Sequence, residues 1–302
     1  MSFIEKQRHG KHTYFYLVKN IRIRSNKVKK LRVWLGREIP KQNELQKYLV
    51  ELEKRAMEQY QTRWLPKELV GKVDDISASI TLFHKTPANV LPKDFLVRYT
   101  YNTNAIEGNR LTLRQTALVL SDRIAPEGTR ADDVIEALNA VDAWDFVKSY
   151  KRRLNKAFVC RIQYEITKNT SCTIQGNYRD SEVRIAGSEH IPPKPAIVPG
   201  LLEDMFAWFY LEKKRLHPIE LAAMFHNKFV NIHPFTDGNG RTARLLMNWI
   251  LLRNKFPPVI IEVSNKEQYY NAIEAADKGD QKPFATYLCS QLLSQYIISI
   301  PS

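Results

Sequence analysis

The feature that most constrains this 302-residue chain is a short glycine-rich turn between two stretches with helical periodicity. The turn lies in residues 233–244, which read HPFTDGNGRTAR. Apolar residues recur at helical spacing on both sides, before it at Leu221, Ala222, Phe225, Phe229 and Ile232 and after it at Leu245, Leu246, Trp249 and Ile250. Two buried helices are therefore predicted, with the glycines at the N-terminus of the second. Unpaired N–H groups and the helix dipole at that position suit a phosphate group.

The polar residues of this segment have complementary chemistry. Arg241, Arg244 and Asn248 share one face of the second helix, and two guanidinium groups there can hold a polyphosphate through forked hydrogen bonds. Asp237 offers an oxygen ligand for magnesium, and His233 can accept a proton near neutral pH. Each residue alone has an ordinary explanation as part of a packed loop or a solvated helix face. Their combination indicates phosphoryl or nucleotidyl transfer.

Beyond residue 40 the pattern is mainly helical. Apolar residues between Leu45 and Tyr60 predict a helix to about residue 63, which Trp64-Leu65-Pro66 ends. Residues 176–199 interrupt the pattern with short alternation followed by dense prolines, which predicts a β-hairpin and an extended segment inside a helical domain. Such an insertion is often functional.

The N-terminus differs from the rest in charge and periodicity. Residues 1–40 hold 11 Lys and Arg against two acids, out of a net charge of +14 for the whole chain. Strict alternation at residues 21–24 and 31–35, around a turn at Ser25-Asn26, predicts a small hairpin or three-stranded sheet with one apolar and one basic face. The basic face is either an ordinary solvated surface or a surface for nucleic acid or another acidic partner.

Composition limits the remaining classes of protein. No apolar run approaches 18 residues and the first residues lack an apolar signal region, so we expect neither a membrane span nor a membrane partner. The three cysteines, Cys160, Cys172 and Cys289, are far apart and lack CxxC spacing. We interpret these cysteines as reduced thiols in a cytoplasmic protein, and their spacing does not support a zinc site.

The segment HPFTDGNGRTAR resembles the signature of the Fic family, HPFxDGNGRxxR, without a departure. The resemblance implies that His233 deprotonates a protein hydroxyl and that Asp237 binds Mg²⁺. It also implies a phosphate cradle for the substrate ATP, formed by Gly238, Asn239, Gly240, Arg241 and Arg244. The expected activity is transfer of AMP from ATP to a Ser, Thr or Tyr side chain of an unidentified target protein. Relatives also remove AMP, and some transfer UMP, phosphate or phosphocholine.

A second stretch resembles the inhibitory pattern of the family, (Ser/Thr)-x-x-x-Glu-(Gly/Asn). It consists of Thr103, Glu107 and Gly108. From the residues alone, Gly108 is a plausible helix C-cap, and Thr112 with Gln115 predicts a capping box that opens the next helix. The resemblance implies that Glu107 pairs with Arg244 and blocks productive placement of the γ-phosphate. Because the pattern lies N-terminal to the core, the chain resembles a class II Fic protein.

Two further segments resemble parts of the family's nucleotide site. Residues 176–193 resemble the flap, a hairpin that binds the target chain by strand addition, and the resemblance implies nucleotide contacts at Val183, Arg184, Ile185 and Ala186. Residues 269–280 resemble the adenine-side segment, with Tyr269 and Tyr270. Within the family, the core is similar to the metazoan adenylyltransferase of the endoplasmic reticulum. Relatives of this class often form homodimers.

The expected fold is mainly α, a Fic helical core with a β-hairpin flap, preceded by a small basic β appendage. We place the appendage and a linking helix at residues 1–75 and the Fic domain at 76–302, with its inhibitory segment at about 95–120. The alternatives are a nucleic-acid-binding regulator that uses its Fic core as a nucleotide sensor, and a Fic enzyme with another donor.

Overall fold

A computed structural model describes residues 2–9, 12–24, 27–57, 60–84 and 94–296. Its N-terminal part is a three-stranded antiparallel sheet in the order β1(Ser2–His9), β2(His12–Arg24) and β3(Lys27–Gly36), followed by α1(Gln42–Met57). The three-stranded sheet confirms the prediction made from the alternating residues. The predicted turn at Ser25-Asn26 lies outside the described residues. One face of the sheet packs on α1 and forms a small core of its own, made of Leu17, Ile21, Leu31, Val33, Leu35, Leu52 and Ala56.

The opposite face of β3 carries Lys30, Arg32 and Trp34, which alternate with the buried residues as the pleat requires. Trp34 is 58% exposed on this face. The positive charge is partly compensated, because Glu5 of β1 forms ion pairs with Lys30 at 2.5 Å and with Arg32 at 3.4 Å. The face is therefore basic and aromatic, with one carboxylate set into it.

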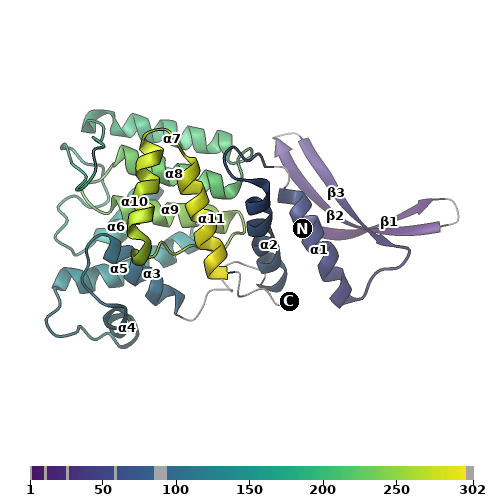
Figure 1. Ribbon diagram of the computed structural model, residues 1–302, viewed down its shortest axis with the longest axis horizontal. Coiled ribbons are helices and arrows are strands. Elements are labelled where there is room, and N and C mark those ends of the chain that lie inside the picture. The colour runs from purple at the N-terminus through teal and green to yellow at the C-terminus, as the bar shows by residue number, and fades with distance from the viewer. Residues whose placement is uncertain (1, 10–11, 25–26, 58–59, 85–93, 297–302) are drawn as a thin grey trace.

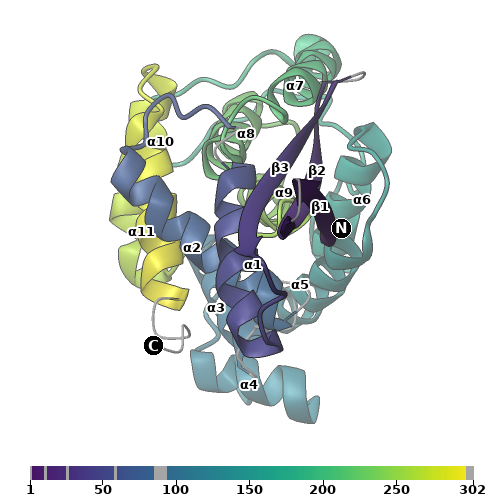
Figure 2. The same ribbon diagram turned by 90° about the vertical axis from the view of Figure 1, so that its right-hand side faces the viewer.

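The chain then enters α2(Lys67–His84), which lies between the sheet unit and the helical bundle (Figures 1 and 2). The predicted helix to about residue 63 was too long, since α1 ends at Met57. The reason is tertiary: the Gln61 amide donates to the Arg215 carbonyl at 2.7 Å, and the His217 amide donates to Gln61. Val73 of α2 joins the main core, and the predicted boundary at residues 75–76 falls inside this helix.

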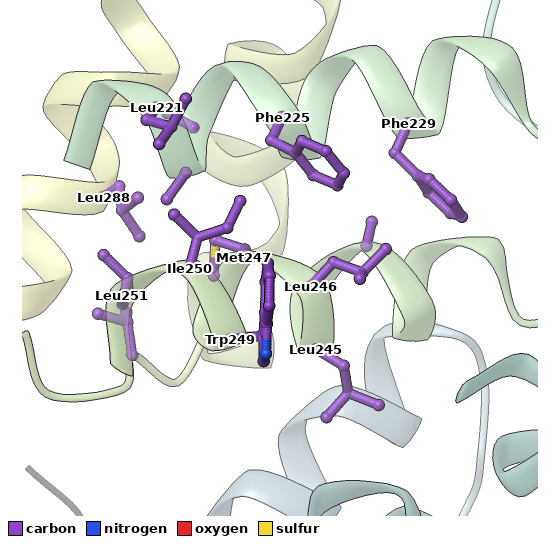
Figure 3. Packing of buried hydrophobic residues seen from close by; sticks show 14 of the residues in the cluster. Leu221, Phe225, Phe229, Leu245, Leu246, Met247, Trp249, Ile250, Leu251 and Leu288 are labelled. Carbon is purple, nitrogen blue, oxygen red and sulfur yellow. The ribbon is translucent and has the colours of Figure 1, made fainter. Parts of the chain in front are cut away.

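The main core is a helical bundle, which confirms the predicted fold class. It contains α3(Phe95–Ile106), α4(Leu113–Asp122), α5(Ala131–Ser149), α6(Lys156–Thr167), α7(Val198–Glu212), α8(Pro218–Ile232), α9(Asn239–Arg253), α10(Lys266–Asp277) and α11(Lys282–Tyr296), with short 3₁₀ turns at Pro195–Ile197 and Val263–Asn265. Figure 3 shows the apolar side chains of α8 facing those of α9, with Leu288 of α11 beside them. Nearly all of α9 is buried, its polar residues included. The helix whose N-terminus begins the site is therefore fixed by packing along nearly its whole length.

The predicted flap takes a different form from the hairpin expected. No strand is assigned between residues 176 and 194, all of which are described; the segment is extended, with a turn where the Ser188 amide donates to the Ile185 carbonyl at 3.2 Å. The alternation in the sequence predicted strands, but it could not reveal that none of the residues the structure describes pairs with this segment as a strand. Among the described residues, no helix is both long and apolar enough to cross a bilayer.

Candidate functional site

The turn between α8 and α9 is fixed by its own side chains. Phe235 is fully buried, and the Asn239 side chain both accepts from the Phe235 amide at 2.9 Å and donates to the Phe235 carbonyl at 2.8 Å. Gly238 precedes the first residue of α9 with φ +79°, where a side chain would be strained. The residues predicted to form the phosphate cradle therefore lie in a closed loop, and the Asn239 side chain holds this loop together instead of pointing out of it.

His233 lies at the end of α8 in a left-handed conformation with φ 49°. The ring is half-buried, and its Nδ1 lies 3.2 Å from the Val230 carbonyl, so the proton belongs on Nδ1. No hydrogen bond to Nε2 is formed by any residue that the structure describes. Burial lowers the pKa of His233, although the Val230 carbonyl opposes this. A neutral imidazole with a free Nε2 is a competent general base.

Arg241 is buried and bridges two carboxylates. Its guanidinium donates to Glu136 Oε1 at 2.7 Å and to both oxygens of Asp237, at 3.2 and 3.1 Å. The sequence analysis missed Glu136, a residue of α5 with no local motif around it. Asp237 itself is 52% exposed at its side chain, so it has room for a further ligand.

Arg244, one turn further along α9, is held by the inhibitory segment. It donates through Nε to Thr103 Oγ1 at 2.9 Å, through one terminal nitrogen to the Thr103 carbonyl at 2.8 Å and to Glu107 Oε1 at 2.7 Å. Burial would lower the pKa of Arg244, but Tyr269 and Glu107 reverse this and raise it above its ordinary value. Glu107 caps the end of α3 and is followed by Gly108 at φ +99°, as a helix C-terminus requires. The predicted capping box of Thr112 and Gln115 is also formed.

Glu107 also lies directly on the first turn of α9. A Cβ atom at Gly240 would come within 2.2 Å of Glu107 Oε1, so the carboxylate takes the space next to the glycine. An anion bound to the α9 N-terminus would meet the same guanidinium and the same backbone. The Glu107 carboxylate therefore occupies the space beside Gly240 in which the predicted phosphate site lies.

The two tyrosines of the adenine-side segment take different positions. Tyr269 is 1% exposed, and its hydroxyl lies between Arg244 at 3.3 Å and the buried His226 at 2.9 Å. Burial lowers the pKa of His226 to about 3, so this ring is neutral. Tyr270 is half-exposed and donates to the Ile106 carbonyl at 3.4 Å, beside the inhibitory segment. Tyr269 thus lies behind Arg244, whereas Tyr270 borders the site.

The flap is attached by Arg179 to the loop of residues 233–238 between α8 and α9, which we call the catalytic loop after the role predicted for His233. The sequence analysis did not single out Arg179 as a site residue. This side chain is 3% exposed and donates through Nε to the His233 carbonyl at 2.8 Å. Its other nitrogens donate to the carbonyls of Ser181 and Pro193, and its amide donates to the Pro234 carbonyl at 2.9 Å. One buried guanidinium therefore connects both ends of the flap to the residue proposed as the base.

A second connection lies beyond the flap turn, where His190 Nε2 is 2.8 Å from the Asn231 carbonyl and Asn231 donates to Asp277 at 3.1 Å. The residues between these attachments, 183–186, are exposed or half-buried. Among the described residues no hydrogen bond or ion pair joins them to residues 238–244. Their nucleotide contacts remain a prediction.

The described side chains could supply a magnesium ion with one accessible carboxylate ligand, that of Asp237. No cluster of three or more His, Cys, Asp or Glu side chains suited to a metal occurs among the described residues. Asp237 supplies one accessible carboxylate, and Mg²⁺ is commonly held by one or two carboxylates together with substrate phosphates. The donor set therefore suits an ion that arrives with a polyphosphate.

Comparison with known proteins agrees with this geometry. Residues 153–251 match the Fic/DOC family. The chain is 34% identical over 234 residues to a protein adenylyltransferase Fic of Nematostella vectensis, covering 74% of this chain and 54% of that protein. A counterpart in Aedes aegypti is 34% identical over 201 residues, covering 65% and 40%. The chain thus spans about half the length of these curated relatives.

Solved structures give the same result. Fic-1 from C. elegans is 30% identical with a TM-score of 0.68, covering 77% of this chain and 72% of that one. A Fic-domain signaling protein from Bacteroides thetaiotaomicron is 27% identical with a TM-score of 0.68, covering 77% and 94%. With the complete signature folded between two buried helices, the chain belongs to the Fic/DOC family.

Proposed function

We propose that this protein transfers AMP from ATP to a Ser, Thr or Tyr hydroxyl of a protein and releases pyrophosphate. The observation that carries the proposal is the placement of His233, with a free Nε2, at one end of a loop whose other end is the N-terminus of α9 with its two buried arginines. A base and an anion site in one loop are what nucleotidyl transfer requires. The names of the curated relatives support the same activity.

In this mechanism the target hydroxyl oxygen attacks the α-phosphorus of ATP. His233 takes the hydroxyl proton on Nε2, while the bond between the α-phosphorus and the bridging oxygen breaks and pyrophosphate leaves. Arg241, Arg244 and the α9 amides stabilise the negative charge of the leaving group. Bound Mg²⁺, held through Asp237, would add charge neutralisation on the phosphates.

Glu107 keeps this activity low in the resting protein, because its carboxylate occupies the position next to Gly240 and uses Arg244. Removal of AMP is compatible with the same site, with Glu107 placing a water molecule. Which direction dominates depends on the signal that displaces Glu107.

The test compares Glu107→Gly with Glu107→Gly/His233→Ala, each incubated with Mg²⁺ and ATP labelled at the α-phosphate. The first protein should label itself or proteins of a lysate, and the second should not. Mass spectrometry of the modified residue then identifies the group as AMP. Parallel reactions of Glu107→Gly with UTP and with CDP-choline test the other donors, and a mass of UMP or phosphocholine there, or of phosphate from ATP, would mean that AMP is not the group transferred. No modification with any of these donors would refute the transferase.

A second function rests on the exposed face of the N-terminal sheet. Trp34 and Arg32 lie side by side on the surface opposite α1, and an aromatic next to cations is typical of nucleic-acid surfaces. We propose nucleic acid as the partner of this face, alongside catalysis. Lys30→Ala/Arg32→Ala should weaken retention of a DNA duplex at low salt, whereas Lys47→Ala/Lys67→Ala, the same charge change on α1 and α2, should not. Absence of retention by the wild type at low salt would refute it.

Three expectations from the sequence stay predictions: the division at residues 75–76, a cytoplasmic location and a homodimer. Analytical ultracentrifugation tests the last of these.

A further inference from the structure

A second basic site lies at the other end of α9 from the catalytic loop. There the C-terminal ends of α7 and α9 meet the segment between α5 and α6 around a cavity of about 380 Å³. Its walls carry six cations and no acid, and we call it the basic pocket: Lys151, Arg152, Arg153, Lys213, Lys214 and Arg253. Helix α9 extends over Asn239–Arg253, which at a rise of 1.5 Å per residue separates the basic pocket from the cradle by about 20 Å. The two sites are distinct.

The cations of the basic pocket lack carboxylate partners. None of the six forms an ion pair with any acid of the part of the chain that the structure describes. The adjacent acid, Glu212, is engaged elsewhere, with Arg63 at 3.1 Å and Arg215 at 4.0 Å. Burial lowers the pKa of Lys213, and the neighbouring Lys214, Arg153 and Arg253 lower it further. Positive charge is therefore concentrated here without compensation, which costs free energy in the absence of an anion.

Aromatic rings hold three of these six cations, Arg153, Lys213 and Arg253, in place. Tyr210 donates to the Leu154 carbonyl at 3.0 Å, and its ring has Arg153 at 4.8 Å and Lys213 at 4.4 Å from the centroid. Arg253 lies 5.9 Å from the centroid of the buried Trp249. The negative ends of the α7 and α9 dipoles also favour cations at this position. The charges are thus positioned before any ligand arrives, which reduces the entropy lost on binding.

We propose that the basic pocket binds a small polyphosphate anion, either inorganic or carried by a nucleotide. Its volume is within the range of small-ligand sites, about 300–1,000 Å³. Arginine and lysine together recognise phosphate through forked and point-charge contacts. Single-stranded nucleic acid is less suitable as the occupant, since stacking of bases needs free aromatic faces and Tyr210 already has two cations on its ring.

The test measures binding of inorganic tripolyphosphate by calorimetry to protein carrying Arg241→Gln, which weakens the cradle at the catalytic end. Binding of tripolyphosphate to the basic pocket does not depend on whether the protein is a transferase. Adding Lys213→Gln/Arg253→Gln should weaken binding at least tenfold, because two charge-assisted contacts are lost. The control Lys47→Gln/Lys67→Gln removes the same charge from exposed positions on α1 and α2 and should leave binding within twofold.

If Arg241→Gln does not fold, the same comparison is made in the wild type, in which Glu107 already covers the cradle. If Lys213→Gln/Arg253→Gln loses the same factor in affinity for tripolyphosphate as for ATP, the pocket recognises the phosphate chain. A loss of affinity for ATP alone would overturn this recognition. The proposal also fails if tripolyphosphate does not bind at millimolar concentration, if both double variants behave alike, or if a single-stranded oligonucleotide binds the pocket and tripolyphosphate does not.

Discussion

Replacement of Glu107 by glycine should release the activity proposed for this protein. The carboxylate accepts from Arg244 at 2.7 Å and lies on Gly240, where phosphate is expected to bind. Glycine removes both the charge and the bulk. Arg244 keeps its bonds to Thr103 and Tyr269, so the guanidinium stays in position and becomes available to the nucleotide.

The size of the effect follows from the interaction that the nucleotide must displace. A hydrogen bond between charged groups contributes about 1.5–3 kcal/mol. The Glu107 side chain is 32% exposed, so solvent screening favours the lower part of that range. Because 1.4 kcal/mol is a factor of ten in affinity, we expect ATP below saturation to label Glu107→Gly about 10- to 30-fold faster than the wild type.

The assay follows self-labelling from ATP labelled at the α-phosphate at several nucleotide concentrations. Glu127→Gly is the matched control, since Glu127 also precedes a glycine but lies exposed in the turn before α5. Glu107→Gln, which keeps the bulk and loses the charge, should give an intermediate rate. Equal rates for wild type and Glu107→Gly at low ATP would refute the competition between Glu107 and phosphate.

Three further results are expected. Because burial lowers the pKa of His233 from its ordinary value of about 6.5, the imidazole stays neutral at pH values somewhat below 6.5. The acid limb of the pH–rate profile of Glu107→Gly should therefore have its midpoint below pH 6.5, and a midpoint above 6.5 would contradict the assignment of His233 as the base. Arg179→Met leaves the carbonyls of His233 and Pro193 without their hydrogen-bond donor, so it should lower the free energy of unfolding by about 2 kcal/mol or more. It should also reduce kcat more than it reduces the affinity for ATP, and an unchanged kcat would disprove a positioning role for Arg179. Gly240→Ala should lower the free energy of unfolding, measured with denaturant, by about 1–3 kcal/mol when made in the wild type and by clearly less when made in Glu107→Gly. Equal losses in the two backgrounds would mean that residues 107 and 240 do not touch.

Much of the fold was predictable because its signals are local. Helical periodicity placed α8 and α9, and strict alternation predicted the N-terminal sheet with one apolar face, although only the structure shows that this face packs on α1. The end of α1 was not predictable, since the pairing of Gln61 with residues 215–217 depends on chain more than 150 residues away. The flap was predicted as a hairpin from its alternation, but an isolated strand needs a partner, and here attachment comes from Arg179.

By itself, the sequence determined the chemistry of the site: which groups could take a proton, bind a metal or hold phosphate, and the turn that brings them together. These properties depend on residue types at short spacing, so they can be inferred without the fold. The contact of Glu107 with Arg244, which comes from another helix, was expected only from the family resemblance. Only the tertiary structure decided that Glu136 holds Arg241 and that Tyr269 lies behind Arg244. These contacts join residues far apart in the chain, and packing of the helices, not local spacing, sets the distances between them.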